Sequence, residues 1–157
     1  MSYWVQSVER RITAPADRIY ALIADPVRHK DFDGSGTLVE AVEVSSSVRP
    51  LGAGDWFSMT MDFHGKYTMT STVVEAVPGE RFAWQCKPHA HSSKWRFIFG
   101  GRIWRYELES DGDTTLVRET WDLREERLRM LVVVGRRQVR VAMRRTLDRI
   151  AALLEAE

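Results

Sequence analysis

The feature that most constrains the fold is a long region of alternating hydrophobicity followed by one long helical pattern. From Thr37 to Leu123 short segments alternate apolar and polar residues, as in Phe57-Ser-Met-Thr-Met61, and turn residues separate them. Such alternation places the apolar side chains on one face of a strand. From Glu125 to Glu155 the apolar period becomes that of a helix. The helix must bury its stripe against the sheet, because no other large apolar surface is available.

The segments before this region predict a strand and two short helices. A first strand is expected over Val5–Thr13, and Pro15 and Asp17 suit the opening of a helix that Asp25-Pro26 ends. A further helical turn is expected over Val27–Phe32. The later expected elements are strands at 38–44, 56–63, 67–77, 82–86, 95–108 and 114–123, with a bend at Gly100-Gly101 and a turn at His64-Gly65, and helices at 125–134 and 136–155.

Length and charge narrow the class of protein. A chain of 157 residues is expected to form one domain, residues 1–157. The net charge of +1 gives no reason to expect nucleic acid as a partner. No secretory signal is visible, and the longest apolar run, Met130–Val134, is too short for a transmembrane segment. We therefore expect a cytoplasmic protein, as a monomer or homodimer.

The order of several segments resembles a known superfamily. They are Ile12-Thr-Ala-Pro-Ala-Asp-Arg-Ile-Tyr-Ala-Leu-Ile-Ala-Asp-Pro26, Leu51-Gly-Ala-Gly-Asp-Trp56, Val74-Glu-Ala-Val-Pro-Gly-Glu-Arg-Phe-Ala-Trp84, Asp111-Gly-Asp-Thr-Thr-Leu-Val117 and Met143-Arg-Arg-Thr-Leu-Asp-Arg-Ile150. Together they resemble the START/Bet v 1-like helix-grip superfamily, and within it the polyketide cyclase/dehydrase-like (SRPBCC) proteins. The resemblance implies an α+β fold in which a curved antiparallel sheet of about seven strands, with two short helices after strand 1, grips a long C-terminal helix.

Between sheet and helix we expect an apolar cavity, and binding of an apolar small molecule there is the preferred function. A polyketide, a lipid or an isoprenoid-like compound would suit it. The expected lining residues are Phe57, Met59, Met61, Phe63, Tyr67, Met69, Trp84, Phe97, Trp104, Tyr106, Met143 and Leu147. The same residues could instead form an ordinary filled core.

Catalysis is the alternative, so whether the chain is an enzyme stays open. A buried acid or base in the same cavity would make an aromatic polyketide cyclase or dehydratase. The polar candidates are Asp62, His64 and Glu119, although a hairpin end favours exposure of the first two and Glu119 could face outward beside Arg118. No catalytic residue is assigned.

The remaining motifs favour simpler interpretations. His89-Ala-His91 lacks an obvious third ligand, so no metal is expected, and no glycine-rich nucleotide motif occurs, so no cofactor is expected. Arginines crowd the long C-terminal helix. A solvated outer face is the simplest interpretation; an anionic ligand group, a membrane surface or a protein-interaction module are the alternatives.

Overall fold

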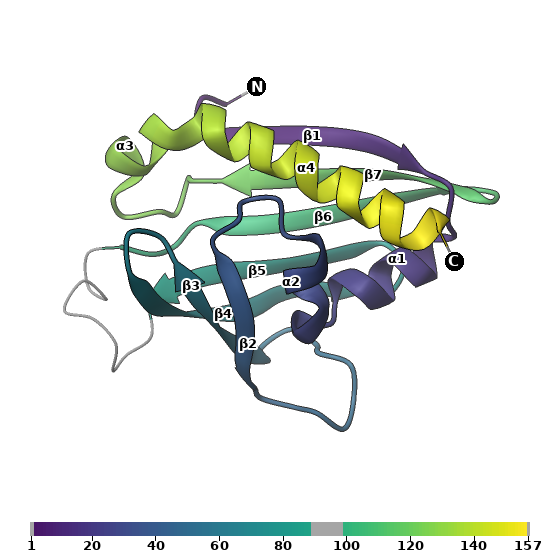
Figure 1. Cartoon of the computed structure of the whole chain (residues 1–157), viewed down its shortest axis with the longest axis horizontal. Helices are drawn as coiled ribbons and strands as arrows, with labels where there is room; N and C mark the ends of the chain where they lie inside the picture. Colours follow the sequence, from purple (N-terminus) through teal and green to yellow (C-terminus); the bar gives the residue numbers. More distant parts are fainter. Residues whose placement is uncertain (1, 89–98, 157) are drawn as a thin grey trace.

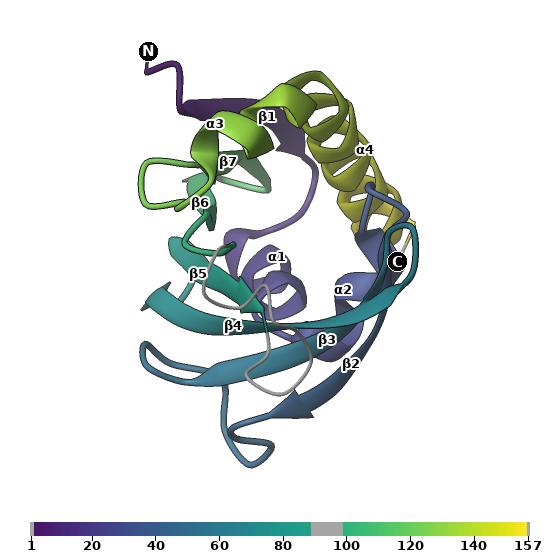
Figure 2. The same ribbon diagram turned by 90° about the vertical axis from the view of Figure 1, so that its left-hand side faces the viewer.

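A seven-stranded antiparallel sheet curves around one long helix in the computed structural model, which describes residues 2–88 and 99–156 (Figures 1 and 2). The strands are β1 (Val5–Ile12), β2 (Leu38–Val44), β3 (Trp56–Asp62), β4 (Lys66–Val77), β5 (Arg81–Pro88), β6 (Ile103–Asp111) and β7 (Thr114–Asp122). The helical elements are α1 (Ala16–Ile23), η1 (Pro26–Arg28), α2 (His29–Phe32), α3 (Arg129–Val132), η3 (Val133–Gly135) and α4 (Arg136–Glu155). The expected helix-grip fold class is therefore confirmed.

The strand order explains how the sheet closes around the helix. Strands β2 to β7 form a meander, and β1 pairs with β7, so the order is β1-β7-β6-β5-β4-β3-β2. Helix α4 packs along β1 at one edge and contacts α2, which packs on β2 at the other edge. Figure 2 shows α1 and α2 lying inside the curve, between the sheet and α4.

Cross-strand pairs fix which side chains face the helix. Trp84 of β5 lies opposite Trp104 of β6, which lies opposite Trp121 of β7. Directly opposed residues share one face of a sheet, so these three indoles belong to the inner face. Met143 and Leu147 of α4 are buried in the core that this face forms.

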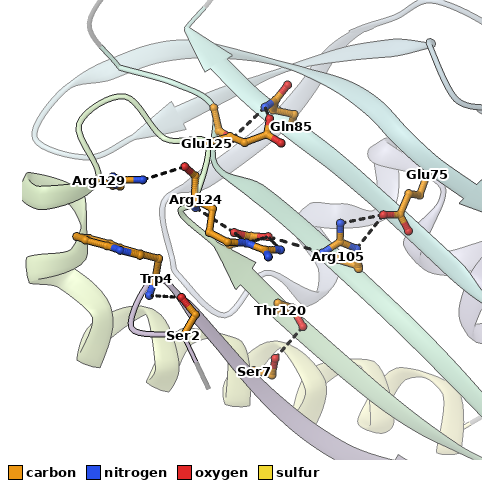
Figure 3. A network of polar contacts seen from close by, with 12 residues as sticks. Ser2, Trp4, Ser7, Glu75, Gln85, Arg105, Thr120, Arg124, Glu125 and Arg129 are labelled. Atoms are coloured by element: carbon orange, nitrogen blue, oxygen red, sulfur yellow. Dashed lines mark hydrogen bonds and ion pairs between the residues drawn. The ribbon is translucent and has the colours of Figure 1, made fainter.

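The outer face carries a network of ion pairs and hydrogen bonds (Figure 3). Arg105 donates to the Glu75 carboxylate at 2.8 and 3.0 Å, and Arg124 holds both oxygens of Asp122 at 2.6 to 3.1 Å. Burial acts to raise the pKa of Asp122, but the hydrogen bonds from Arg124 outweigh it and lower that pKa. The network joins β4, β6 and β7, so we assign it a structural role.

One glycine sets the distance between α4 and the segment that follows α2. The Gly34 amide donates to the Thr146 hydroxyl at 2.9 Å, and that hydroxyl donates to the Ala142 carbonyl at 3.0 Å. A Cβ at position 34 would lie 2.2 Å from the Ala142 oxygen. Only glycine permits this approach, which holds α2 against α4.

The bend expected at Gly100-Gly101 is present, and it displaces the start of the following helix. Both glycines adopt φ values, 120° and 115°, that favour glycine. Glu126 accepts hydrogen bonds from the amides of Gly100 and Arg102. These contacts hold residues 124–128 out of helical geometry, so the helix expected from Glu125 begins at Arg129. Tertiary hydrogen bonds override the local helical pattern here.

Candidate functional site

Two polar atoms on the inner face of β7 are buried without a hydrogen-bond partner in the described part of the chain. They are Oε2 of Glu119 and Nε1 of Trp121. Each residue is 3% exposed. They stand two positions apart on one strand, so both side chains leave the same face of the sheet. Buried polar groups are almost always paired in native proteins, so two neighbouring exceptions make this part of the interior the candidate site.

The electrostatics of the site favour the uncharged form of Glu119. Burial raises the pKa of Glu119 well above its ordinary value, and the nearby negative charge of Asp33 adds to this effect. Tyr106 lies opposite Glu119 on β6, and the two side chains are hydrogen bonded. Burial, followed by the carboxyl of Glu119, also raises the pKa of Tyr106 well above normal. Both shifts favour the protonated form of each group, which is able to donate.

An aromatic cluster adjoins this strand pair, and its centre is His29 of α2. The His29 ring lies 5.1 Å from Trp84, 5.3 Å from Phe32 and 5.7 Å from Phe57, measured between ring centroids. Its Nε2 lies 2.6 Å from the Ile23 carbonyl oxygen. Since a carbonyl can only accept, Nε2 carries the proton. Burial lowers the pKa of His29 to about 4, so the ring is neutral, with Nδ1 unprotonated.

The structure places most of the residues expected from the sequence on the inner face or on the facing side of α4. The strand register puts there Phe57, Met59, Met61, Tyr67, Met69, Trp84, Trp104 and Tyr106, and α4 contributes Met143 and Leu147. Met61, Tyr67, Trp84 and Trp104 are half-buried, whereas the other six are buried.

Three expected residues lie elsewhere. Asp62, Phe63 and His64 are exposed at the turn between β3 and β4. The turn needs positive φ at His64 and Gly65, which carries these side chains away from the inner face. The expectation that they contribute to the site is therefore corrected. Phe97 and the pair His89 and His91 lie outside the described residues.

Three residues of the candidate site were not predicted from the sequence. Trp121 lies two positions after Glu119 on the same strand, so the sequence could have placed both side chains on one face. His29 and Asp33 come from a short helix and the turn after it, where a period of two or 3.6 residues says nothing about which side chains reach the sheet. Their positions depend on the Gly34 contact with α4.

A shallow depression of about 280 Å³ lies on the outer surface of the sheet. It is lined by Glu80, Arg81, Glu107, Leu108, Glu109, Leu116 and Arg118. Arg118 is held there by Glu9 and Glu107. A lining of mixed charge, in which Arg118 pairs with Glu107, does not suit an apolar ligand, so we place the candidate site on the inner face.

A curved sheet gripping a helix across an aromatic interior defines the helix-grip class of ligand-binding folds. The chain belongs to the polyketide cyclase / dehydrase and lipid transport family, whose model matches residues 4–155. This confirms the resemblance seen in the sequence. No helix within the described residues is long and apolar enough to cross a membrane.

Known relatives agree with this family membership. An uncharacterized protein of Mycobacterium tuberculosis, Rv0088, is 37% identical over 119 residues. The match covers 74% of this chain and 46% of that protein, so the chain spans about half the length of its curated relative. A second Mycobacterium tuberculosis strain carries a protein that matches to the same extent.

Solved structures show the same fold at low sequence identity. A Staphylococcus epidermidis protein superposes with a TM-score of 0.72 at 11% identity, covering 99% of this chain and 92% of that one. An Arthrobacter aurescens protein gives 0.70 at 15% identity, covering 99% and 88%. A Chromobacterium violaceum protein gives 0.68 at 17% identity, covering 98% and 99%. These likenesses bear on the fold alone.

Proposed function

We propose that this chain binds an apolar small molecule between the sheet and α4 and holds it by an oxygen atom. The observation that carries the proposal is the pair of unpartnered buried atoms, Glu119 Oε2 and Trp121 Nε1. A buried donor without a partner costs about 1 to 3 kcal/mol. A ligand that satisfies both atoms removes that cost when it binds.

The chemistry of the two groups indicates what the ligand offers. The indole Nε1–H of Trp121 can only donate. The raised pKa of Glu119 favours its neutral form, and its hydrogen bond with Tyr106 engages one carboxyl oxygen. When Tyr106 donates to that oxygen, the second oxygen, Oε2, carries the acid proton and also donates. Two donors side by side favour an acceptor, so the ligand we propose is an apolar ring or chain that carries a carbonyl oxygen.

Three half-buried side chains support an entry route at one end of the sheet. Met61, Tyr67 and Trp104 are inner-face residues near the strand ends that lie farthest from α1. At the other end, the core is closed by the contact of Tyr20 in α1 with Phe82, whose rings lie 6.0 Å apart. We infer that the ligand enters from the first end and is stopped by α1.

Fluorescence titration with prodan, a naphthyl ketone whose emission moves to shorter wavelength in apolar surroundings, tests the proposal. We expect saturable binding with blue-shifted emission. Trp121→Phe should weaken it by about five- to tenfold, the equivalent of one lost hydrogen bond. Trp56→Phe is the matched control, because Trp56 lies on β3 with parity opposite to the inner Phe57.

Two results would contradict the proposal. One is an absence of saturable prodan uptake by the unmodified chain. The other is an equal affinity loss in Trp121→Phe and Trp56→Phe. A second ligand, the same dimethylaminonaphthalene without its ketone, should bind equally well to the unmodified chain and to Trp121→Phe.

We also propose a second function, that of a cyclase or dehydratase, which is favoured by the burial of Glu119 and the raised pKa that follows from it. A carboxylic acid kept protonated in an apolar site can polarise a carbonyl and act as general acid. The family description includes cyclase and dehydrase members. Glu119→Gln separates the two functions: an enzyme should lose turnover of a polyketone substrate at least a hundredfold while keeping prodan binding. Unchanged turnover would exclude Glu119 as the acid.

A further inference from the structure

Three apolar side chains project into solvent from the short helical stretch before α4. Met130 is 73% exposed, Leu131 60% and Val134 76%. At 100° per residue these positions fall within one arc of about 100°, while Val132 and Val133 on the other side pack on the core. With the exposed Tyr3 from the N-terminal segment, they form a surface that we call the apolar tip. Single exposed apolar residues are common, but a cluster marks an interaction site.

The apolar tip is continuous with a strongly basic segment. Residues 127–147 contain seven arginines and no acidic residue. The whole chain carries +1 and this segment +7, so the rest of the chain carries −6. Arg137 and Arg140, in the first turns of α4, are exposed, and no carboxylate within the described residues pairs with either. The positive charge at this end is thus available to an external partner.

Contacts at the base of the tip fix its position. The Arg129 guanidinium lies 5.0 Å from the centre of the Trp4 ring, and that of Arg136 lies 4.9 Å from the centre of the Tyr3 ring. Arg136 also donates to the Tyr3 carbonyl at 3.1 Å. These contacts tie the N-terminal segment to α3 and α4. Figure 1 shows α3 beside the N-terminus, at the opposite end of α4 from the C-terminus.

We propose that the apolar tip and its arginines dock the protein on an anionic lipid surface. Aliphatic side chains that protrude from a basic surface enter the boundary between headgroups and acyl chains, and the flanking arginines contact the anionic headgroups. Nucleic acid fits less well, since its non-specific binding surfaces use charge with aromatic stacking rather than aliphatic protrusions. Neither Glu119 nor any interior ligand enters this proposal, so it stands or falls separately from the proposed function.

Co-sedimentation with vesicles tests the docking proposal. We expect binding to phosphatidylcholine vesicles that contain 30% phosphatidylglycerol, and much weaker binding to phosphatidylcholine alone. The variant M130S/L131S/V134S should bind the anionic vesicles on the order of a hundredfold more weakly. The variant R137Q/R140Q should lose about fivefold per arginine and show a smaller dependence on salt. All five side chains are exposed, so circular dichroism should show unchanged folding.

Matched controls separate docking from general effects. Lys30→Gln with Lys66→Gln removes two exposed charges elsewhere, and Val48→Ser removes an exposed apolar side chain from a loop; neither change should weaken binding. A dye sensitive to polarity, attached at Leu131→Cys, should move to shorter-wavelength emission on the anionic vesicles. Cys86 is buried, so the new thiol reacts selectively.

The proposal is overturned by any of three results. These are no binding of the unmodified chain to anionic vesicles, control variants that lose as much affinity as the tip variants, and a dye at position 131 whose emission does not move on bound vesicles. The last result would indicate a charge contact without insertion, as expected of a surface for an acidic protein.

Discussion

At the scale of single residues, Glu119 and His29 give the interior opposite responses to pH. Both are buried, and the pKa of each is shifted in the direction that favours its uncharged form. Burial raises the pKa of the carboxyl and lowers that of the imidazole, because both shifts favour the neutral form. Each shift makes stability depend on pH, and the two contributions have opposite signs.

For Glu119 we predict stability that decreases as pH rises. Above its ordinary pKa of 4.5 the unfolded chain releases a proton that the folded chain keeps, until pH passes the raised folded pKa. The free energy of unfolding should then fall by up to about 1.4 kcal/mol per pH unit. Glu119→Gln should remove this dependence. Urea unfolding of both proteins between pH 5 and 9 measures it, and parallel curves for the two would contradict a buried neutral carboxyl.

For His29 the prediction has the opposite sign. Its folded pKa is about 4 and its ordinary value 6.5, so between these values the unfolded chain holds more protons. Stability should be fully present above pH 6.5 and fall by up to about 3 kcal/mol on acidification to pH 4. His29→Gln should flatten that acid limb relative to the unmodified chain. An unchanged slope below pH 6 would mean that the imidazole is not buried as described.

Part of this site could be predicted from the sequence. Glu119 was a candidate because a carboxyl group buried in the cavity could act as an acid or base, but its direction stayed open until the register with Tyr106 and Val8 placed it inside. The burial of His29 could not be predicted, since a single histidine in a four-residue helix forms no spacing pattern with other residues. Its burial comes from long-range packing on Trp84 and Phe57.

At the scale of elements, the alternation of apolar and polar residues predicted the strands. The helical spacing of apolar residues did not predict every helix boundary. The face of β3 that holds Phe57 and Met59 was visible in the sequence because strand parity is a local property. The start of α3 was misplaced because Glu126 is held by Gly100 and Arg102, which are distant in sequence. Local patterns report local geometry, and these contacts are not local.

The contact between Gly34 and α4 gives the prediction at this scale. Gly34→Ala should lower the free energy of unfolding by about 3 kcal/mol, because the new Cβ would lie 2.2 Å from the Ala142 oxygen, a backbone atom. Gly135→Ala is the matched control: it has a negative φ of −82° and no atom within 4 Å of the added Cβ. It should be neutral or slightly stabilising. Thermal unfolding compares them, and equal losses would contradict the close approach.

At the scale of the whole molecule, the surfaces differ in the kinds of residues that they carry. The outer face of the sheet is crosslinked by ion pairs such as those of Arg105 and Asp122 (Figure 3). The inner face is aromatic and holds the two unpartnered polar atoms. The apolar tip lies where α3 meets the N-terminal segment. The two proposals together describe a protein that holds an apolar ligand inside the sheet and docks on a lipid surface through the apolar tip.

The central claim is that an oxygen of the ligand accepts a hydrogen bond inside the sheet, and the indole proton of Trp121 reports on it directly. We propose ¹H–¹⁵N spectra of the tryptophan side chains during a prodan titration, with the Trp121 signal assigned by its loss in Trp121→Phe. Prodan should produce a saturable downfield shift of the Trp121 indole proton, while the signal of the outer-face Trp56 stays in place. A Trp121 signal that does not move at saturating prodan would contradict it.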